Sequence, residues 1–171
     1  MIDTRSVQGR SSRRASFFLA LSLTVGSFGC SSVISEYDVD ADFTISPKVD
    51  GTFFWWNEIT LDSDVNSYGS ARLGFVRLDV LPPAEDLTFL SSVLGEAVTS
   101  TDRTTIVSQS PMPAGEPEVI LDLKYTGDVR PFFEDGRKVR LEWTGKTNPK
   151  FLAWPPGGIK VAVKARLLLD D

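Results

Sequence analysis

Hydrophobic and polar residues alternate with a period of two over much of the chain beyond residue 36. In residues 37–45, YDVDADFTI, the odd positions are apolar and the even positions carry aspartates and a threonine. Residues 53–61, 117–125, 137–143 and 159–169 repeat the alternation. Successive side chains of a strand point to opposite faces, so this pattern predicts antiparallel strands with one face in a core.

Three further segments fit less simply. Residues 71–81 slip phase by one position beside Gly74, which predicts a β-bulge. Residues 82–95, PPAEDLTFLSSVLG, fit either a short helix or a turn that leads into a strand, because the apolar spacing matches a helical stripe. Residues 103–110 form a weak strand candidate, followed by a loop.

Glycine, proline and aspartate separate these segments, for example at Asp135-Gly136 and around Pro155. Seven or eight strands with little helix predict an all-β fold. We expect an antiparallel β-sandwich of immunoglobulin-like or jelly-roll type over residues 36–171, with a closed barrel as the rival architecture. Trp143 is expected in its core.

The N-terminal residues have the three-part layout of an export signal. Four arginines, at positions 5, 10, 13 and 14, precede an uncharged apolar run from Phe17 to Phe28, and Cys30 follows. The run has 12 residues, and a helix that crosses a bilayer needs about 20. Residues 1–29 are therefore expected to be a helical signal peptide rather than a transmembrane segment.

The segment GSFGC, which ends at Cys30, resembles the lipobox of bacterial lipoprotein signal peptides. The resemblance implies that Cys30 carries the lipid, such as palmitate, and that residues 30–35 tether the domain to the membrane. Ser31, where the family's inner-membrane proteins have aspartate, implies the outer membrane, with the domain facing the periplasm or the cell surface. Alternatively, Cys30 is incidental to an ordinary cleavage site. SRRASFF also resembles a twin-arginine signal, but the general export route is favoured.

Composition excludes several kinds of chemistry. Without residues 1–29, 14 lysines and arginines stand against 22 aspartates and glutamates, a net charge of −8, which argues against nucleic-acid binding. The chain has no histidine and one cysteine, so it lacks the usual general base, the commonest zinc ligand and any internal disulfide. We expect neither enzymatic activity nor a cofactor.

Exposed aromatic residues are the main candidates for ligand binding. Phe54 and Trp56 are predicted to share the outer face of the 53–61 strand with Glu58, and Trp154 lies in a Pro-Gly turn. Aromatic faces beside a carboxylate suit either a sugar ring or a partner protein. The expected function is a protein-interaction or structural module of the cell envelope. The alternative is a carbohydrate-binding module that uses Phe54, Trp56 and Trp154.

Charged clusters give weaker candidates. Asp62 and Asp64, with Asn66, lie in a predicted loop and are possible calcium ligands, as are the strand aspartates at 38, 40 and 42, although a solvated acidic surface explains both groups more simply. The basic residues of the last two strands would form one stripe if those strands paired; they are Lys138, Arg140, Lys160, Lys164 and Arg166. Carboxylate pairs such as Glu134 with Asp135, or Asp122 with Glu142, offer no motif for glycoside hydrolysis.

Overall fold

The computed structural model describes residues 34–46 and 48–171, so the expected signal peptide and Cys30 lie outside the described residues. The described part contains nine strands and two single-turn 3-10 helices. They are β1 (Ile34–Ile45), β2 (Thr52–Thr60), η1 (Val65–Ser67), β3 (Ser70–Val80), β4 (Leu90–Val98), β5 (Arg103–Gln109), β6 (Glu118–Ile120), β7 (Asp122–Leu123), η2 (Arg130–Phe132), β8 (Lys138–Thr147) and β9 (Ile159–Asp170).

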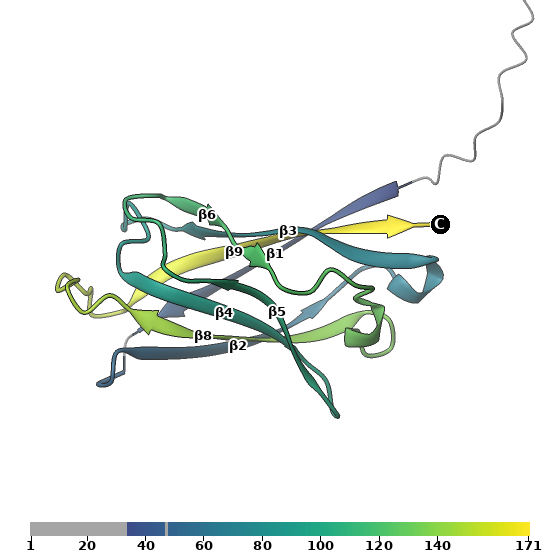
Figure 1. Cartoon of the computed structure of the whole chain (residues 1–171), viewed down its shortest axis with the longest axis horizontal. Coiled ribbons are helices and arrows are strands. Elements are labelled where there is room, and N and C mark those ends of the chain that lie inside the picture. Colours follow the sequence, from purple (N-terminus) through teal and green to yellow (C-terminus); the bar gives the residue numbers. More distant parts are fainter. Residues whose placement is uncertain (1–33, 47) are drawn as a thin grey trace, which may run out of the picture. The chain divides into compact units, whose positions relative to one another are not determined.

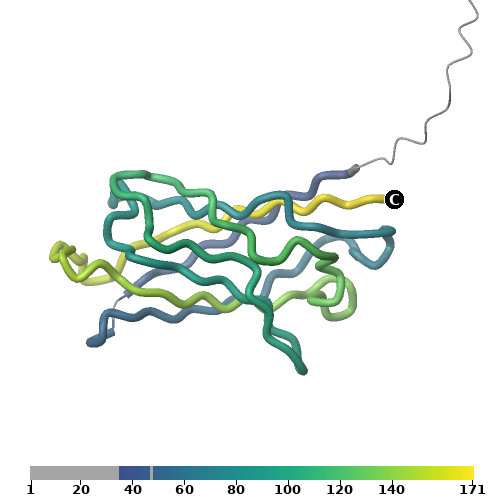
Figure 2. The backbone as a smooth tube through the Cα atoms, viewed as in Figure 1, coloured from purple at the N-terminus to yellow at the C-terminus, as the bar shows by residue number. Residues whose placement is uncertain are grey.

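The strands form two antiparallel sheets packed as a β-sandwich, as the alternation predicts (Figure 1). One sheet has the order β1-β9-β3-β6 and the other β2-β8-β4-β5-β7. Ile34 pairs with Asp170, so β1 begins beside the end of β9, and Figure 2 shows the two chain segments together. Because β1 begins at Ile34, the strand covers the last two residues of the expected 30–35 tether.

The local predictions for most strands are confirmed. The inward positions of β1, β2, β8 and β9 are buried or half-buried, and Trp143 is 1% exposed. The register of β3 against β9 shifts between Leu73 and Phe75, which places the expected bulge at Gly74. A side chain there would press against Leu168 at 3.3 Å, so glycine suits the close approach of the two strands.

Two predictions about strand organisation need correction. Residues 117–125 form two short strands instead of one: β6 pairs with β3 in one sheet and β7 with β5 in the other. The crossing occurs at Leu121, whose N–H donates to Val76. Residues 82–89 form turns that lead into β4, so the strand alternative was right, because Leu87 and Phe89 are buried by the sheets rather than by a helix stripe.

The core lies between the two sheets, and different features cover it on its two open sides. On one side the chain itself crosses from β6 to β7. On the other, β1 and β2 are the sheet edges, and Phe43 stacks on Trp55 with ring centroids 4.6 Å apart. A cavity of about 50 Å³ remains in the interior, lined by apolar side chains such as Ala97, Ile106 and Trp143.

Candidate interaction surface

The outer face of β2 carries the most exposed aromatic side chains of the described sheets. Phe54 is 46% exposed and Trp56 is 50% exposed, while Phe53 on the opposite face is 3% exposed. This alternation places the two predicted aromatic residues where the sequence expected them. We call the strand with these two side chains the aromatic edge, because β2 is the edge of its sheet.

Only one face of the Trp56 indole is open to a ligand. The Arg140 guanidinium lies over the indole, 4.6 Å from the ring centroid, in cation–π geometry. Arg140 comes from β8, the strand next to β2, and its Nε and Nη2 donate to Glu142 Oε1 at 3.1 and 2.8 Å. One face of the indole is therefore covered, and its orientation is fixed by the neighbouring strand.

Glu142 continues this charge network across the sheet. Its other oxygen, Oε2, lies 2.7 Å from Arg103 Nη2 on β5, and Arg103 Nη1 donates to Glu96 at 2.8 Å. The network thus links β2, β8, β4 and β5 through Trp56, Arg140, Glu142, Glu96 and Arg103. It holds the outer face of this sheet as one unit next to the aromatic edge.

Glu142 is 4% exposed although it points to the outer face. The Arg103 and Arg140 side chains cover its carboxylate. Burial raises the pKa of Glu142, but the hydrogen bonds from Arg103 and Arg140 outweigh burial and hold the pKa below its ordinary range. The carboxylate is charged at neutral pH.

Within the described residues, the outer side of the β2 backbone is free beyond Thr52, whose own N–H and C=O bond to Asp50 and Lys48. Just beyond its two ends, Leu61 N donates to Arg137 O at 2.9 Å and Thr147 N to Gly51 O at 2.8 Å. Hydrogen-bonded pairs alternate in an antiparallel ladder, so the odd-numbered residues of β2 bond to β8. Even-numbered residues such as Trp56 therefore turn their N–H and C=O groups away from the sheet, and within the described residues β2 pairs only with β8.

A shallow depression adjoins Phe54 at one end of the aromatic edge. Its lining includes Lys48, Lys146, Leu94 and Thr144 as well as the phenylalanine ring. Gly145 is also part of its lining. The depression therefore combines apolar and basic groups at the surface.

Trp154 does not join the other two aromatic candidates. It packs edge-on against Phe89 and Phe151, with ring centroids 5.7 and 5.4 Å away, and is partly buried against the core. These contacts anchor the loop between β8 and β9. Trp154 is therefore half-buried and packed apart from Phe54 and Trp56, and its part in ligand binding stays a prediction.

Two of the acidic calcium candidates, Asp64 and Asp38, have structural partners for their carboxylates. Asp64 caps η1 by accepting from Asn66 N at 2.9 Å. On β1, Asp38 binds Arg166, whose Nε lies at 2.7 Å. Among residues 34–46 and 48–171, no three acidic side chains gather as a metal site would require.

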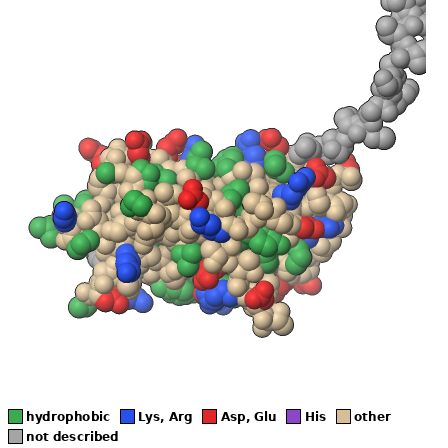
Figure 3. Space-filling view, viewed as in Figure 1, with side chains coloured by type: hydrophobic (Ala, Val, Ile, Leu, Met, Phe, Trp, Pro, Cys, Tyr) green, Lys and Arg blue, Asp and Glu red, His purple; other side chains and the backbone are tan. Residues whose placement is uncertain are grey.

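The predicted basic stripe does not form, because β8 and β9 belong to different sheets. Four of the five predicted stripe residues are instead paired with acids: Lys138 with Glu58, Arg140 with Glu142, Lys164 with Asp79 and Arg166 with Asp38. Figure 3 shows basic and acidic side chains interspersed on the visible face. Asp122 and Glu142 lie on β7 and β8, with β4 and β5 between them, so they do not form a carboxylate pair.

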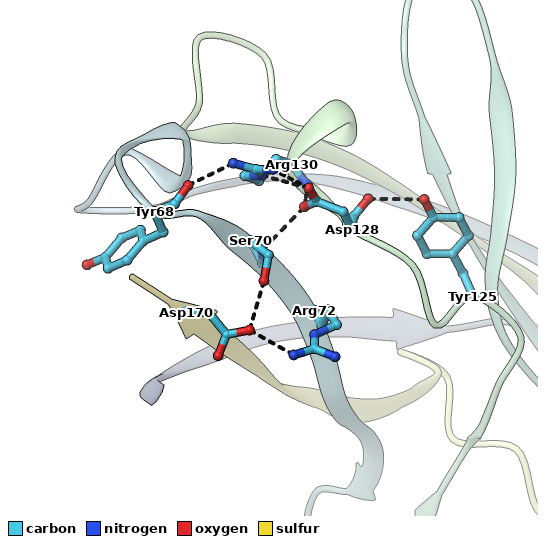
Figure 4. Close-up of polar contacts among 8 residues, drawn as sticks. Tyr68, Ser70, Arg72, Tyr125, Asp128, Arg130 and Asp170 are labelled. Atoms are coloured by element: carbon cyan, nitrogen blue, oxygen red, sulfur yellow. Dashed lines mark hydrogen bonds and ion pairs between the residues drawn. The ribbon is translucent and has the colours of Figure 1, made fainter. Parts of the chain in front are cut away.

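A second polar cluster lies at the end of the sandwich where β9 finishes (Figure 4). Asp128 accepts from Arg130 Nε at 2.7 Å, and Arg130 Nη1 donates to Tyr68 O at 2.7 Å. Nearby, Asp170 accepts from Ser70 and Arg72 at 2.8 and 2.7 Å. The carboxylates are satisfied by these neighbours, so the cluster fastens loops to the sheet and offers no free catalytic group.

Cys30, the predicted lipid attachment point, lies outside the described residues. Among the residues that the structure describes, no helix is long and apolar enough to span a membrane.

No family model matches the chain, and no curated protein does. Among solved structures, that of turnip yellow mosaic virus is 14% identical, covers 82% of this chain and 94% of its own, and has a TM-score of 0.35. The structure of Desmodium yellow mottle tymovirus is 14% identical, covers 98% and 96%, and has a TM-score of 0.28. Both TM-scores are low, so the likeness transfers no function to this chain.

Proposed function

We propose that this protein is a lipid-anchored lipoprotein of the cell envelope whose β-sandwich binds a partner protein through the aromatic edge. The anchor rests on the sequence: an arginine-rich leader, a short apolar run and Cys30 in the lipobox-like GSFGC. Ser31 favours the outer membrane. Cleavage before Cys30 leaves a short tether ahead of β1, which begins at Ile34.

Of the two sandwich types expected, we propose the jelly roll. The strand pairs nest within one another, β4 with β5, β3 with β6, β2 with β8 and β1 with β9, as in a long hairpin rolled into two sheets. The small strand β7 is an addition at the edge of one sheet. This topology supports a binding scaffold, because it leaves β2 as a long outer strand.

The observation that carries the proposed function is the aromatic edge itself. An edge strand whose outward backbone groups are free from Phe54 to Thr60 and that carries two half-exposed aromatic side chains is a template for strand addition. An extended segment of a partner would bond to the even-numbered backbone groups and pack side chains against Trp56 and Phe54. Aromatic side chains dominate the energetics of such contacts.

Photo-crosslinking in living cells tests this function. p-Benzoylphenylalanine replaces Trp56 in the full chain, and in a matched control it replaces Asp42 on the outer face of β1. We expect a covalent adduct with a protein, identified by mass spectrometry, at position 56 and not at position 42. Adducts at neither position, or equal adducts at both, would contradict binding at the aromatic edge.

The alternative is a carbohydrate-binding module, and the depression beside Phe54 is the feature that favours it. Lys48 and Lys146 flank the ring, so an acidic polysaccharide would fit better than a neutral one. Titration with acidic and neutral polysaccharides, read by tryptophan fluorescence, separates the two functions. Saturable quenching that disappears in Lys146→Glu would favour the carbohydrate function over protein binding.

A further inference from the structure

The edges of the sandwich differ in how well they are protected against strand addition. Strands β6 and β7, at two of the sheet edges, have three and two residues. Strand β1 carries four acids on its outer face, Glu36, Asp38, Asp40 and Asp42, so two copies of β1 would repel each other. Strand β2 has nine residues and contains no proline, lysine or glycine, the residues that usually protect an edge.

We propose that the partner of the aromatic edge is a second copy of this chain, paired β2 to β2 in antiparallel orientation about a two-fold axis through Asn57. This inference rests on the proposed function and names its partner. The pairing would join the two five-stranded sheets into one continuous sheet. A two-fold interface of this kind closes on itself and uses the β2 edge of both copies, so only the short or acidic edges remain.

The free backbone groups restrict the register. They belong to even-numbered residues of both copies, so even positions must bond to even positions. Near the middle of β2 the axis can then pass through Trp55, Trp56, Asn57 or Glu58. An axis at Glu58 would place two carboxylates opposite each other, and an axis at Trp55 would crowd two indoles, each already stacked on Phe43.

Charge complementarity favours the axis at Asn57 over the axis at Trp56. With Asn57 on the axis, Glu58 of each copy lies opposite Trp56 of the other copy. The Arg140 guanidinium lies over that indole, 4.6 Å from its centroid. Glu58 of each copy would therefore lie near Arg140 of the other copy, which gives two charge pairs on the outer face. With Trp56 on the axis, the two Arg140 side chains would be neighbours and Glu58 would face Phe54.

Asn57 supplies the second, independent argument. Its Oδ1 is buried and has no hydrogen-bond donor among the described residues, whereas buried amide oxygens are normally bonded. On the axis, Asn57 faces Asn57 of the second copy in a non-hydrogen-bonded backbone pair, in which side chains approach most closely, with Cβ atoms about 4.5–5.5 Å apart. Because this oxygen is enclosed by its own chain in the single copy, the amide must rotate toward the open edge, and each Nδ2 can then donate to the Oδ1 of the other copy.

Cysteine crosslinking tests the register directly. In a non-hydrogen-bonded pair the Cα atoms are about 4.5 Å apart, within the range for a disulfide. The full chain carrying Asn57→Cys is oxidised mildly and analysed on a non-reducing gel. The controls are the unsubstituted chain, which retains Cys30, and Asp42→Cys on β1. We expect a covalent dimer for Asn57→Cys alone; no dimer, or an equal dimer for Asp42→Cys, overturns the proposal.

A second pair of variants tests the charge argument in the same assay. Glu58→Lys, added to Asn57→Cys, places a cation against Arg140 of the other copy, and we expect the dimer yield at low protein concentration to fall about tenfold. Asp42→Lys, which makes the same charge change on β1, should leave the yield unchanged. Equal effects of the two variants would overturn the assigned register.

The two proposals fail separately. If the photo-crosslinker at position 56 captures a different protein while Asn57→Cys gives no dimer, the aromatic edge is a docking site but a second copy is not its partner. If position 56 captures another copy of this chain and Asn57→Cys crosslinks, both are supported. If neither crosslink forms, both are wrong.

Discussion

Replacing Glu142 with glutamine should destabilise the protein in a pH-dependent way. Glu142 is 4% exposed and receives contacts from Arg140 Nε, Arg140 Nη2 and Arg103 Nη2 at 3.1, 2.8 and 2.7 Å. Glutamine keeps the shape but removes the charge, so the charge-assisted bonds become neutral ones or lose their geometry. Each charge-assisted bond contributes about 1 kcal/mol more than a neutral one.

The expected loss in the free energy of unfolding is smaller than the sum over the three charge-assisted bonds. The Arg103 and Arg140 side chains are 48% and 46% exposed, so water screens them and solvates them once the carboxylate is gone. We therefore expect a loss of about 2 kcal/mol in the free energy of unfolding near pH 7. For a domain of this size that lowers Tm by about 6 °C, measured by circular dichroism.

The sign of the pH dependence follows from the lowered pKa of Glu142. Burial raises this pKa, but the two arginines lower it further, so the folded-state pKa lies below the unfolded one. The stabilisation is then complete above the unfolded pKa of about 4.3 and is lost as the pH falls through the folded pKa. The Tm difference between the two proteins should shrink as the pH is lowered from 6 to about 3.

Asp122→Asn is the matched control. Asp122 lies on β7 of the same sheet, but its side chain is 66% exposed and the cation paired with it, Lys124 Nζ, is 3.7 Å away. Its Tm should stay within the experimental error of the parent protein. An equal loss in both variants, or a Glu142→Gln loss that is the same at pH 3 and pH 7, would refute the reasoning.

Three further predictions concern packing and the anchor. Gly145→Ala should cost about 2 kcal/mol or more, because the new Cβ would lie 2.2 Å from Ser92 O, while Gly157→Ala, with open space around it, should leave chemical denaturation unchanged. Ala97→Val should gain up to about 1 kcal/mol by filling the 50 Å³ cavity; a lower denaturation midpoint would show that the cavity cannot accept it. Mass spectrometry of the mature protein should find its N-terminus at an acylated Cys30, and an unmodified cysteine or a cut elsewhere would exclude the anchor.

Local sequence patterns were sufficient for features that depend on one strand. The alternation in β1 and β9, the bulge at Gly74 and the exposure of Phe54 and Trp56 follow from the side-chain period and from hydrophobicity. These features need no knowledge of the neighbouring strands. They set the inner and outer faces of the sandwich correctly.

Features that depend on strand order were not accessible from the sequence. Residues 117–125 keep the alternation of apolar and polar side chains while the chain passes from one sheet to the other. Periodicity alone therefore predicts one strand where the structure has β6 and β7. Burial of Glu142 arises from Arg103, which is distant in sequence and reaches it from β5 across β4. The basic stripe failed for the same reason, since it required β8 and β9 to pair.

The proposed lipid anchor and the proposed β2 pairing together would restrict how a dimer lies on the membrane. The start of β1 is at the Thr60 end of β2, since Asp62 N donates to the Tyr37 hydroxyl at 3.2 Å. Antiparallel pairing about Asn57 therefore places the two Ile34 residues at opposite ends of the shared sheet. Four residue steps separate Cys30 from Ile34 and span at most about 14 Å, about half the length of a nine-residue strand. On these two proposals, both lipids would reach one membrane only if the strands lay parallel to its surface, with the two-fold axis along the membrane normal.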